Sequence, residues 1–146
     1  MKKRNPPAAR PDDPVGRGRA GKIIYWIATI WLALGMTSTG IVQLLKNQAD
    51  IDLMNHLGYP VYLLTILGIW KILGVIAVLI PRFRLLKEWA YAGFFFAMSG
   101  AVFSHIASGS SAKEFFGPVL LIILTVLSWY FRPVERKIIS INQINE

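Results

Sequence analysis

Lys71 is the residue whose type and position most strongly suggest chemistry. It lies near the middle of a long apolar run, about 15 Å from either end if the run is helical. An ammonium in such a segment should face the interior of the protein, with a partner or without its charge. No carboxylate lies at matching depth in the other runs, which leaves carbonyls, hydroxyls such as Thr37, Ser38 or Ser99, or a ligand. Two interpretations stay open, a lysine hydrogen-bonded inside the protein and a site that binds a ligand or handles protons.

Aromatic and small residues surround this lysine in the sequence. Trp70 precedes it, and a glycine lies three residues away on either side, which we expect to leave room beside the side chain. A cationic donor beside aromatic rings would suit a quinone headgroup or another lipophilic carbonyl compound. The candidate site residues are Lys71, Trp70, His105, Ser104, Gly68 and Gly74.

Histidines and acidic residues form a second, weaker candidate at one boundary of the apolar runs. A possible cluster there consists of His56, Asp52 and Glu114, with His105 nearby. Two histidines with carboxylates could bind a metal, or the histidines alone a haem iron, but the spacing is nonspecific and we predict no metal. The chain has no cysteine, which excludes thiolate chemistry and iron–sulfur clusters. No phosphate-binding loop or catalytic triad occurs either, so no catalytic residue is assigned.

The composition indicates what kind of protein positions these residues. Only 16% of the residues are charged and 54% are hydrophobic. Soluble domains carry about a quarter charged residues, so this is the composition of a membrane protein. The net charge of +8 does not indicate nucleic-acid binding, because the basic residues flank apolar runs instead of sharing a folded surface.

Four apolar runs are long enough to span the roughly 30 Å hydrocarbon layer as helices. They cover residues 23–45, 59–80, 89–107 and 115–131, within a transmembrane domain over 23–137. Residues 1–22 are rich in proline, glycine and charge and should be a disordered basic tail, and 138–146 should form a C-terminal tail. The predicted fold is therefore all-α, an integral membrane four-helix bundle.

Lysine and arginine alternate between the two ends of these runs. They gather in the N-terminal tail, in the loop after residue 80 and in the C-terminal tail, whereas the other two loops hold only Lys46 and Lys113. Because short basic loops stay on the cytoplasmic side, both termini are predicted to be cytoplasmic. We therefore expect a multi-pass protein of a bacterial cytoplasmic (inner) membrane.

Small residues and helix ends suggest how the runs pack. A stripe on the third run should allow close helix contact, as should small residues on the first two runs. Glu88 and Glu114 are expected at the N-termini of the third and fourth helices, and Pro118 in the first turn of the fourth. The stripe consists of Gly93, Ala97, Gly100, Ala101 and Ser104, and the other small residues are Gly35, Thr39, Gly68 and Gly74.

The segment from His56 to His105 resembles the DoxX-like family of small four-helix bacterial membrane proteins. The residues that carry the resemblance are Gly58-Tyr59-Pro60, Gly68-Ile69-Trp70-Lys71, Leu86-Lys87-Glu88-Trp89-Ala90-Tyr91-Ala92-Gly93 and Ser104-His105. It covers roughly 22–137 and implies a distant relation to DoxX and DoxD, membrane subunits associated with thiosulfate:quinone oxidoreduction. Family members often carry an acidic residue after the Ser-His segment, where this chain has Ser108-Gly109-Ser110-Ser111. That departure weakens a metal site at this boundary.

Three functions follow as hypotheses. The first is a membrane subunit of a quinone-linked or redox-stress complex, which would not be an enzyme on its own. The second is a non-catalytic scaffold whose basic loops and tail bind a partner protein or anionic lipid. The third and least favoured is a small transporter, since such proteins usually centre on an intramembrane carboxylate. Besides the lipid bilayer, a membrane or cytosolic protein partner and a homo-oligomer are conceivable partners.

Overall fold

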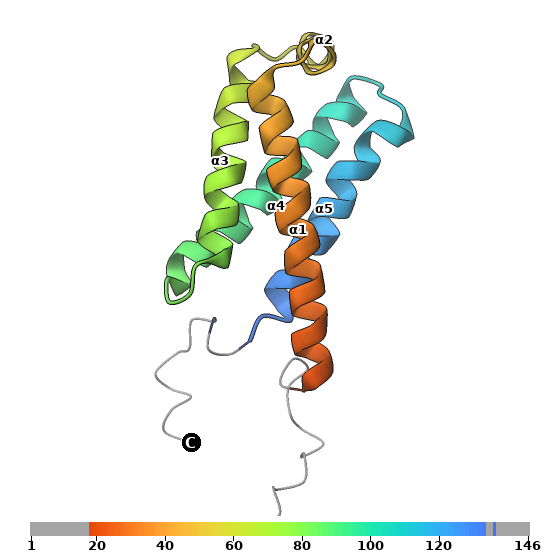
Figure 1. Ribbon diagram of the computed structural model, residues 1–146. Helices are drawn as coiled ribbons and strands as arrows, with labels where there is room; N and C mark the ends of the chain where they lie inside the picture. Colours follow the sequence, from red (N-terminus) through yellow and green to blue (C-terminus); the bar gives the residue numbers. More distant parts are fainter. Residues whose placement is uncertain (1–17, 134–135, 137–146) are drawn as a thin grey trace, which may run out of the picture.

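The computed structural model describes residues 18–133 and 136, and in this part of the chain it is all-helical. Four long helices form an antiparallel bundle, and each is long and apolar enough to cross a membrane (Figure 1). They are α1 (Arg19–Leu45), α3 (Tyr62–Leu79), α4 (Arg84–Ala107) and α5 (Ala112–Tyr130). The predicted fold class is confirmed. The predicted tails lie outside the described residues, except that residues 19–22 belong to α1 instead of the tail.

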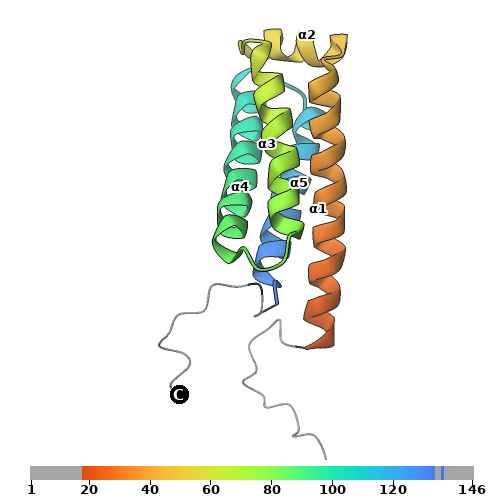
Figure 2. The same cartoon turned by 60° about the vertical axis from the view of Figure 1, so that its left-hand side comes forward.

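Each long helix packs against two others. Helix α1 contacts α3 and α5, and α4 contacts the same two helices from the other side (Figures 1 and 2). The core between them consists of Leu32, Met36, Val75, Val78, Tyr91, Phe94, Met98 and Leu121. The outer surface is apolar as well, with Trp31 63% exposed and Phe103 72% exposed. Such a surface suits lipid, so the chain is a multi-pass membrane protein.

A fifth, short helix was not predicted. Helix α2 (Gln48–Leu57) lies across one end of the bundle, nearly at right angles to the other helices (Figure 2). The Asn47 side chain caps it by accepting a hydrogen bond of 2.9 Å from the Asp50 N–H. Gly58, with φ at 77°, ends it in the left-handed conformation that glycine adopts without strain. These signals indicate a helix where we expected a loop, and Met54 anchors it by being buried.

Besides α1, two helices begin earlier than their apolar runs. Helix α4 begins at Arg84 and not near residue 89, because its first turns include polar residues that hydropathy excludes. Glu88 therefore lies beyond the first turn, and its predicted place at the helix N-terminus is wrong. Helix α5 begins at Ala112, so Glu114 is in the first turn as expected, but Pro118 lies inside the helix and not in its first turn.

Glycines bring α1 and α3 into close contact. A Cβ atom built at Gly68 would lie 2.8 Å from the carbonyl oxygen of Gly40, so the backbones approach closely there. Gly35 is similarly close to Leu121, and Gly74 to the ring of Phe94. In the small-residue stripe predicted for the third run, Ala97 packs against the core, but the two glycines do not make such a contact. A Cβ at Gly93 or Gly100 would meet nothing within 4 Å, because the other helices pack against a different face of α4.

Candidate functional site

Lys71 lies in the bundle interior at the contact between α1 and α3. Its side chain is buried, with the residue 7% exposed. Its Nζ donates a hydrogen bond of 3.2 Å to the Thr39 hydroxyl. That hydroxyl donates in turn to the Gly35 carbonyl at 2.9 Å, so its oxygen is free to accept from the lysine. The partner is therefore Thr39 and not one of the three hydroxyl residues expected from the sequence.

Helix α2 supplies the counter-charge that the apolar runs lack. The Asp50 carboxylate is close enough to Lys71 to interact electrostatically with its ammonium. Two acceptor atoms at this end, Oε1 of Gln43 and Oδ2 of Asp50, are buried without a hydrogen-bond partner. Thr39 and Gln43 are one helical turn apart on α1. Polar groups thus extend from Lys71 toward the end of the bundle that α2 covers.

A groove between α3 and α4 adjoins this lysine. It has a volume of about 390 Å³, and Lys71, Trp70 and Gly74 are among its lining residues, with Trp89 and Phe94 from α4. Trp70 is 67% exposed, so the groove opens to the lipid-facing surface. The room expected beside the lysine at Gly68 is absent, because Gly40 and Leu44 occupy it.

Ser104 and His105 lie apart from this groove, near the α2 end of the bundle. The Ser104 hydroxyl is 2.8 Å from the Tyr59 hydroxyl and so joins α4 to the segment before α3. His105 is buried, with its Nδ1 3.2 Å from the Ser110 hydroxyl and 3.8 Å from a carboxylate oxygen of Glu114. Lys71 and Trp70 thus line the same groove, whereas Ser104 and His105 lie elsewhere.

The possible cluster of His56, Asp52 and Glu114 is not assembled as a metal site. Among the residues that the structure describes, no group of three histidines or acidic residues could hold a metal ion. Asp52 instead accepts a hydrogen bond of 2.9 Å from Gln48, and His56 is exposed in the last turn of α2.

Lys87 lies in α4 at the opposite end of the bundle, although the sequence predicted it in a loop. It is fully buried and donates to the carbonyls of Ala77, Val78 and Ile80, the second at 2.5 Å. Carbonyls in the last turn of a helix have no partner within the helix. Lys87 therefore caps the C-terminus of α3.

Arg132 is a second buried cation at the same end of the bundle as Lys87. Its Nη2 pairs with the Glu88 carboxylate, whose other oxygen accepts a hydrogen bond of 2.8 Å from the Trp129 indole. Its guanidinium carbon lies 5.4 Å from the centre of the Tyr91 ring. The residue is only 3% exposed, yet Nε and Nη1 have no hydrogen-bond partner among residues 18–133 and 136.

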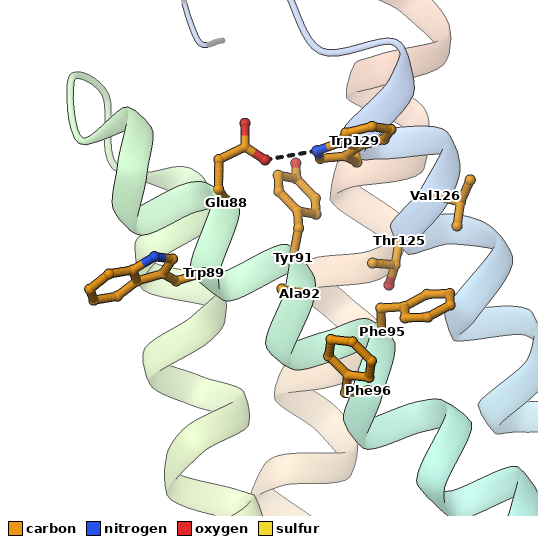
Figure 3. A pocket seen from close by; sticks show the side chains of 9 residues that line it. All are labelled: Glu88, Trp89, Tyr91, Ala92, Phe95, Phe96, Thr125, Val126 and Trp129. Atoms are coloured by element: carbon orange, nitrogen blue, oxygen red, sulfur yellow. Dashed lines mark hydrogen bonds between the residues drawn. The ribbon is translucent and has the colours of Figure 1, made fainter. Parts of the chain in front are cut away.

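A chain of hydroxyl groups continues from there into the bundle. The Ser128 hydroxyl is 2.7 Å from that of Tyr91 and 2.7 Å from that of Thr29, and Thr29 donates to the Tyr25 carbonyl. A second groove, of about 510 Å³, lies between α4 and α5 beside this chain (Figure 3). It runs from Glu88 and Trp129 to Phe95 and Phe96.

The spacing of residues along α4 carries a signal for the buried position of Lys87 that hydropathy alone does not show. Lys87, Tyr91, Phe94, Met98 and His105 are all buried and recur at helical steps on one face of α4. That spacing would have placed Lys87 on the buried face. Arg132 lies just beyond the end of α5, and no pattern in the sequence distinguishes it from an exposed cation.

The two ends of the described bundle carry net charges of opposite sign. The end where α1 begins holds seven basic residues and one acidic residue, and the α2 end holds two basic residues and three acidic ones. The first set is Arg19, Lys22, Arg82, Arg84, Lys87, Arg132, Arg136 and Glu88, and the second is Lys46, Lys113, Asp50, Asp52 and Glu114.

The lipid-facing surface, the four spanning helices and the buried lysine define a small multi-pass membrane protein with intramembrane polar sites. A family model described as the DoxX-like family matches residues 27–128. The chain therefore belongs to the DoxX-like family, as the resemblance indicated. Neither the curated proteins nor the solved structures contain a match to it.

Proposed function

We propose that the protein is a membrane subunit of a redox complex and binds a quinone in the groove between α3 and α4. The observation that supports this proposal is the position of Lys71, a buried cation that lines a lipid-facing groove. In this proposal the protein is not an enzyme on its own, and electrons pass between the quinone and a partner protein. A bacterial cytoplasmic membrane, with both termini inside, is the location that the basic end of the bundle favours.

The groove has the properties that a quinone headgroup requires. Its volume of about 390 Å³ lies within the usual range for small-molecule sites, and its lining is apolar except near the lysine. Trp70 and Trp89 offer flat rings for stacking against the headgroup. Because the groove opens toward lipid, an isoprenoid tail can stay in the bilayer while the headgroup binds.

Lys71 is the hydrogen-bond donor for a quinone carbonyl in this proposal. Its ammonium now donates to Thr39 on α1, while its residue also lines the groove. Binding therefore involves a turn of the lysine side chain from the hydroxyl to the carbonyl. The Asp50 carboxylate attracts the lysine ammonium, and a charged donor stabilises the negative charge that a quinone gains on reduction.

Binding of a short-tailed quinone to the protein in nanodiscs tests the proposal, with quenching of tryptophan fluorescence as the signal. Lys71→Met removes the donor and keeps the length of the side chain, and Lys113→Met, at an exposed position, is the matched control. We expect Lys71→Met to weaken binding about tenfold or more, the usual effect of losing one charged hydrogen bond. Equal affinity in the two variants would refute the role of Lys71.

The scaffold hypothesis is the second candidate, supported by the charge at the end where α1 begins. Five basic residues at this end are not buried, namely Arg19, Lys22, Arg82, Arg84 and Arg136, and they form a surface that suits an acidic partner protein. The matching experiment is affinity purification in mild detergent with mass spectrometry of bound proteins and small molecules. A stoichiometric protein partner with no co-purified quinone would favour the scaffold over the quinone site.

Transport is the least supported function because apolar layers separate the polar groups. On α1, Leu32 and Met36 lie between Thr29, in the hydroxyl chain, and Thr39, the partner of Lys71. Both of these apolar residues are fully buried or nearly so. A polar solute would therefore meet an apolar core at mid-depth in this conformation.

A further inference from the structure

We propose that the groove between α4 and α5 is a binding site for one anionic phospholipid, whose phosphate is held by Arg132. Arg132 lies at the opposite end of the bundle from α2, although Trp89 lines both this groove and the one between α3 and α4. The lipid proposal does not depend on the quinone proposal. Three observations support it: the unpaired donors of Arg132, the shape of the groove and the charge around it.

Arg132 lacks acceptors that its burial requires. The residue is 3% exposed, and within the described part of the chain Nη2 has a partner, the Glu88 carboxylate. Nε and Nη1 are buried and make no hydrogen bond with any residue that the structure describes. Buried donors are nearly always paired in proteins, because an unpaired one loses its bonds to water without replacement. A phosphate group, like a carboxylate, offers oxygen acceptors that match the donors of a guanidinium.

The guanidinium lies beside the groove, although Arg132 is not itself among its lining residues. Arg132 pairs with Glu88 and lies over the ring of Tyr91, and both of those residues line the groove. In Figure 3, Glu88, Tyr91 and Trp129 gather at one end of the groove, and the Glu88–Trp129 hydrogen bond spans it. Arg132 follows α5 by two residues, so this is the end of the bundle where lipid headgroups lie.

The remainder of the groove is apolar and open to lipid. Ala92, Phe95, Phe96 and Val126 line it, and Phe96 is 70% exposed. With a volume of about 510 Å³, it is larger than the groove between α3 and α4, which has about 390 Å³. A ligand with a charged head and an apolar chain matches this arrangement, because its chain can enter from the side while its head reaches the arginine.

The local charge favours an anionic lipid over a zwitterionic one. Both oxygens of the Glu88 carboxylate are engaged, by Arg132 and Trp129, so its charge is compensated. Arg136 adds a further cation, donating a hydrogen bond of 3.2 Å to the Tyr25 hydroxyl. A basic end of this kind attracts anionic headgroups.

Lipid binding to the purified full-length protein in mild detergent tests the site. Phosphatidylglycerol and phosphatidylcholine with the same acyl chains are titrated separately, and bound lipid is counted by native mass spectrometry. We expect tighter binding of phosphatidylglycerol to the native protein. Arg132→Gln should weaken that binding about tenfold or more, as expected for a lost charged hydrogen bond. Arg82→Gln removes the same charge from an exposed position at the same end and should change it little.

A second pair of variants leaves the Arg132–Glu88 ion pair intact. It therefore tests the lipid site even if Arg132→Gln does not fold. Ala92→Leu fills the groove, and Ala107→Leu adds the same atoms at an exposed position at the other end of α4. We expect only the first to weaken phosphatidylglycerol binding. Equal binding of the two lipids, equal losses in the two arginine variants, or no effect of Ala92→Leu would each overturn the proposal.

Discussion

Replacing Gly68 by alanine tests the close contact between α1 and α3. The new methyl carbon would lie 2.8 Å from the Gly40 carbonyl oxygen and 2.8 Å from Cγ of Leu44. The Leu44 side chain is partly exposed and can turn away. The carbonyl oxygen belongs to the backbone, so it can move only if α1 moves.

The size of the effect follows from two opposing contributions. Overpacking of a tight contact costs about 1–3 kcal/mol. Alanine is also a better helix former than glycine by about 0.5–1 kcal/mol. We therefore expect Gly68→Ala to lower the free energy of unfolding by about 1–2 kcal/mol.

Gly93→Ala is the matched control, since a methyl group there would meet no atom within 4 Å. It should keep the helix-forming gain without the clash, so the two variants should differ by about 1–3 kcal/mol. Reversible unfolding in mixed detergent micelles, followed by tryptophan fluorescence and circular dichroism, measures this difference. If the two variants are equally stable, the helices do not approach as closely as the structure indicates.

Three further predictions concern other contacts. Lys87→Met should lower the free energy of unfolding by about 2–4 kcal/mol, because it leaves buried carbonyls of α3 unpaired, whereas Lys22→Met should change it little. In a double-mutant cycle, Tyr91→Phe should cost about 1 kcal/mol and Ser128→Ala somewhat more, because Ser128 also bonds to Thr29; the double variant should cost little more than Ser128→Ala alone, and additive losses would contradict the shared hydrogen bond. Asn47→Ala should cost α2 about 1 kcal/mol and speed amide hydrogen exchange within it, and unchanged exchange would show that the cap does not hold that helix.

The candidate site was only partly predictable. The burial of Lys71 followed from its depth in an apolar run, because a charged group there must avoid lipid. Its relation to Asp50 did not follow, because that carboxylate belongs to α2, which folds over the end of the bundle. Lys87 was missed because a hydropathy pattern treats a lysine as a boundary, whereas its long side chain reaches the carbonyls of α3 from inside the bundle.

The four spanning helices follow from the sequence alone, because hydrophobic length is a local property of the chain, and its motifs are enough to indicate the family. Which small residues make contacts depends on the tertiary structure: Gly40 and Gly68 meet, whereas Gly93 and Gly100 face open space. A small residue permits close approach but does not choose its neighbour, and that choice depends on how all the helices rotate against one another. The same packing left Arg132 buried with unpaired donors, which no local pattern could show.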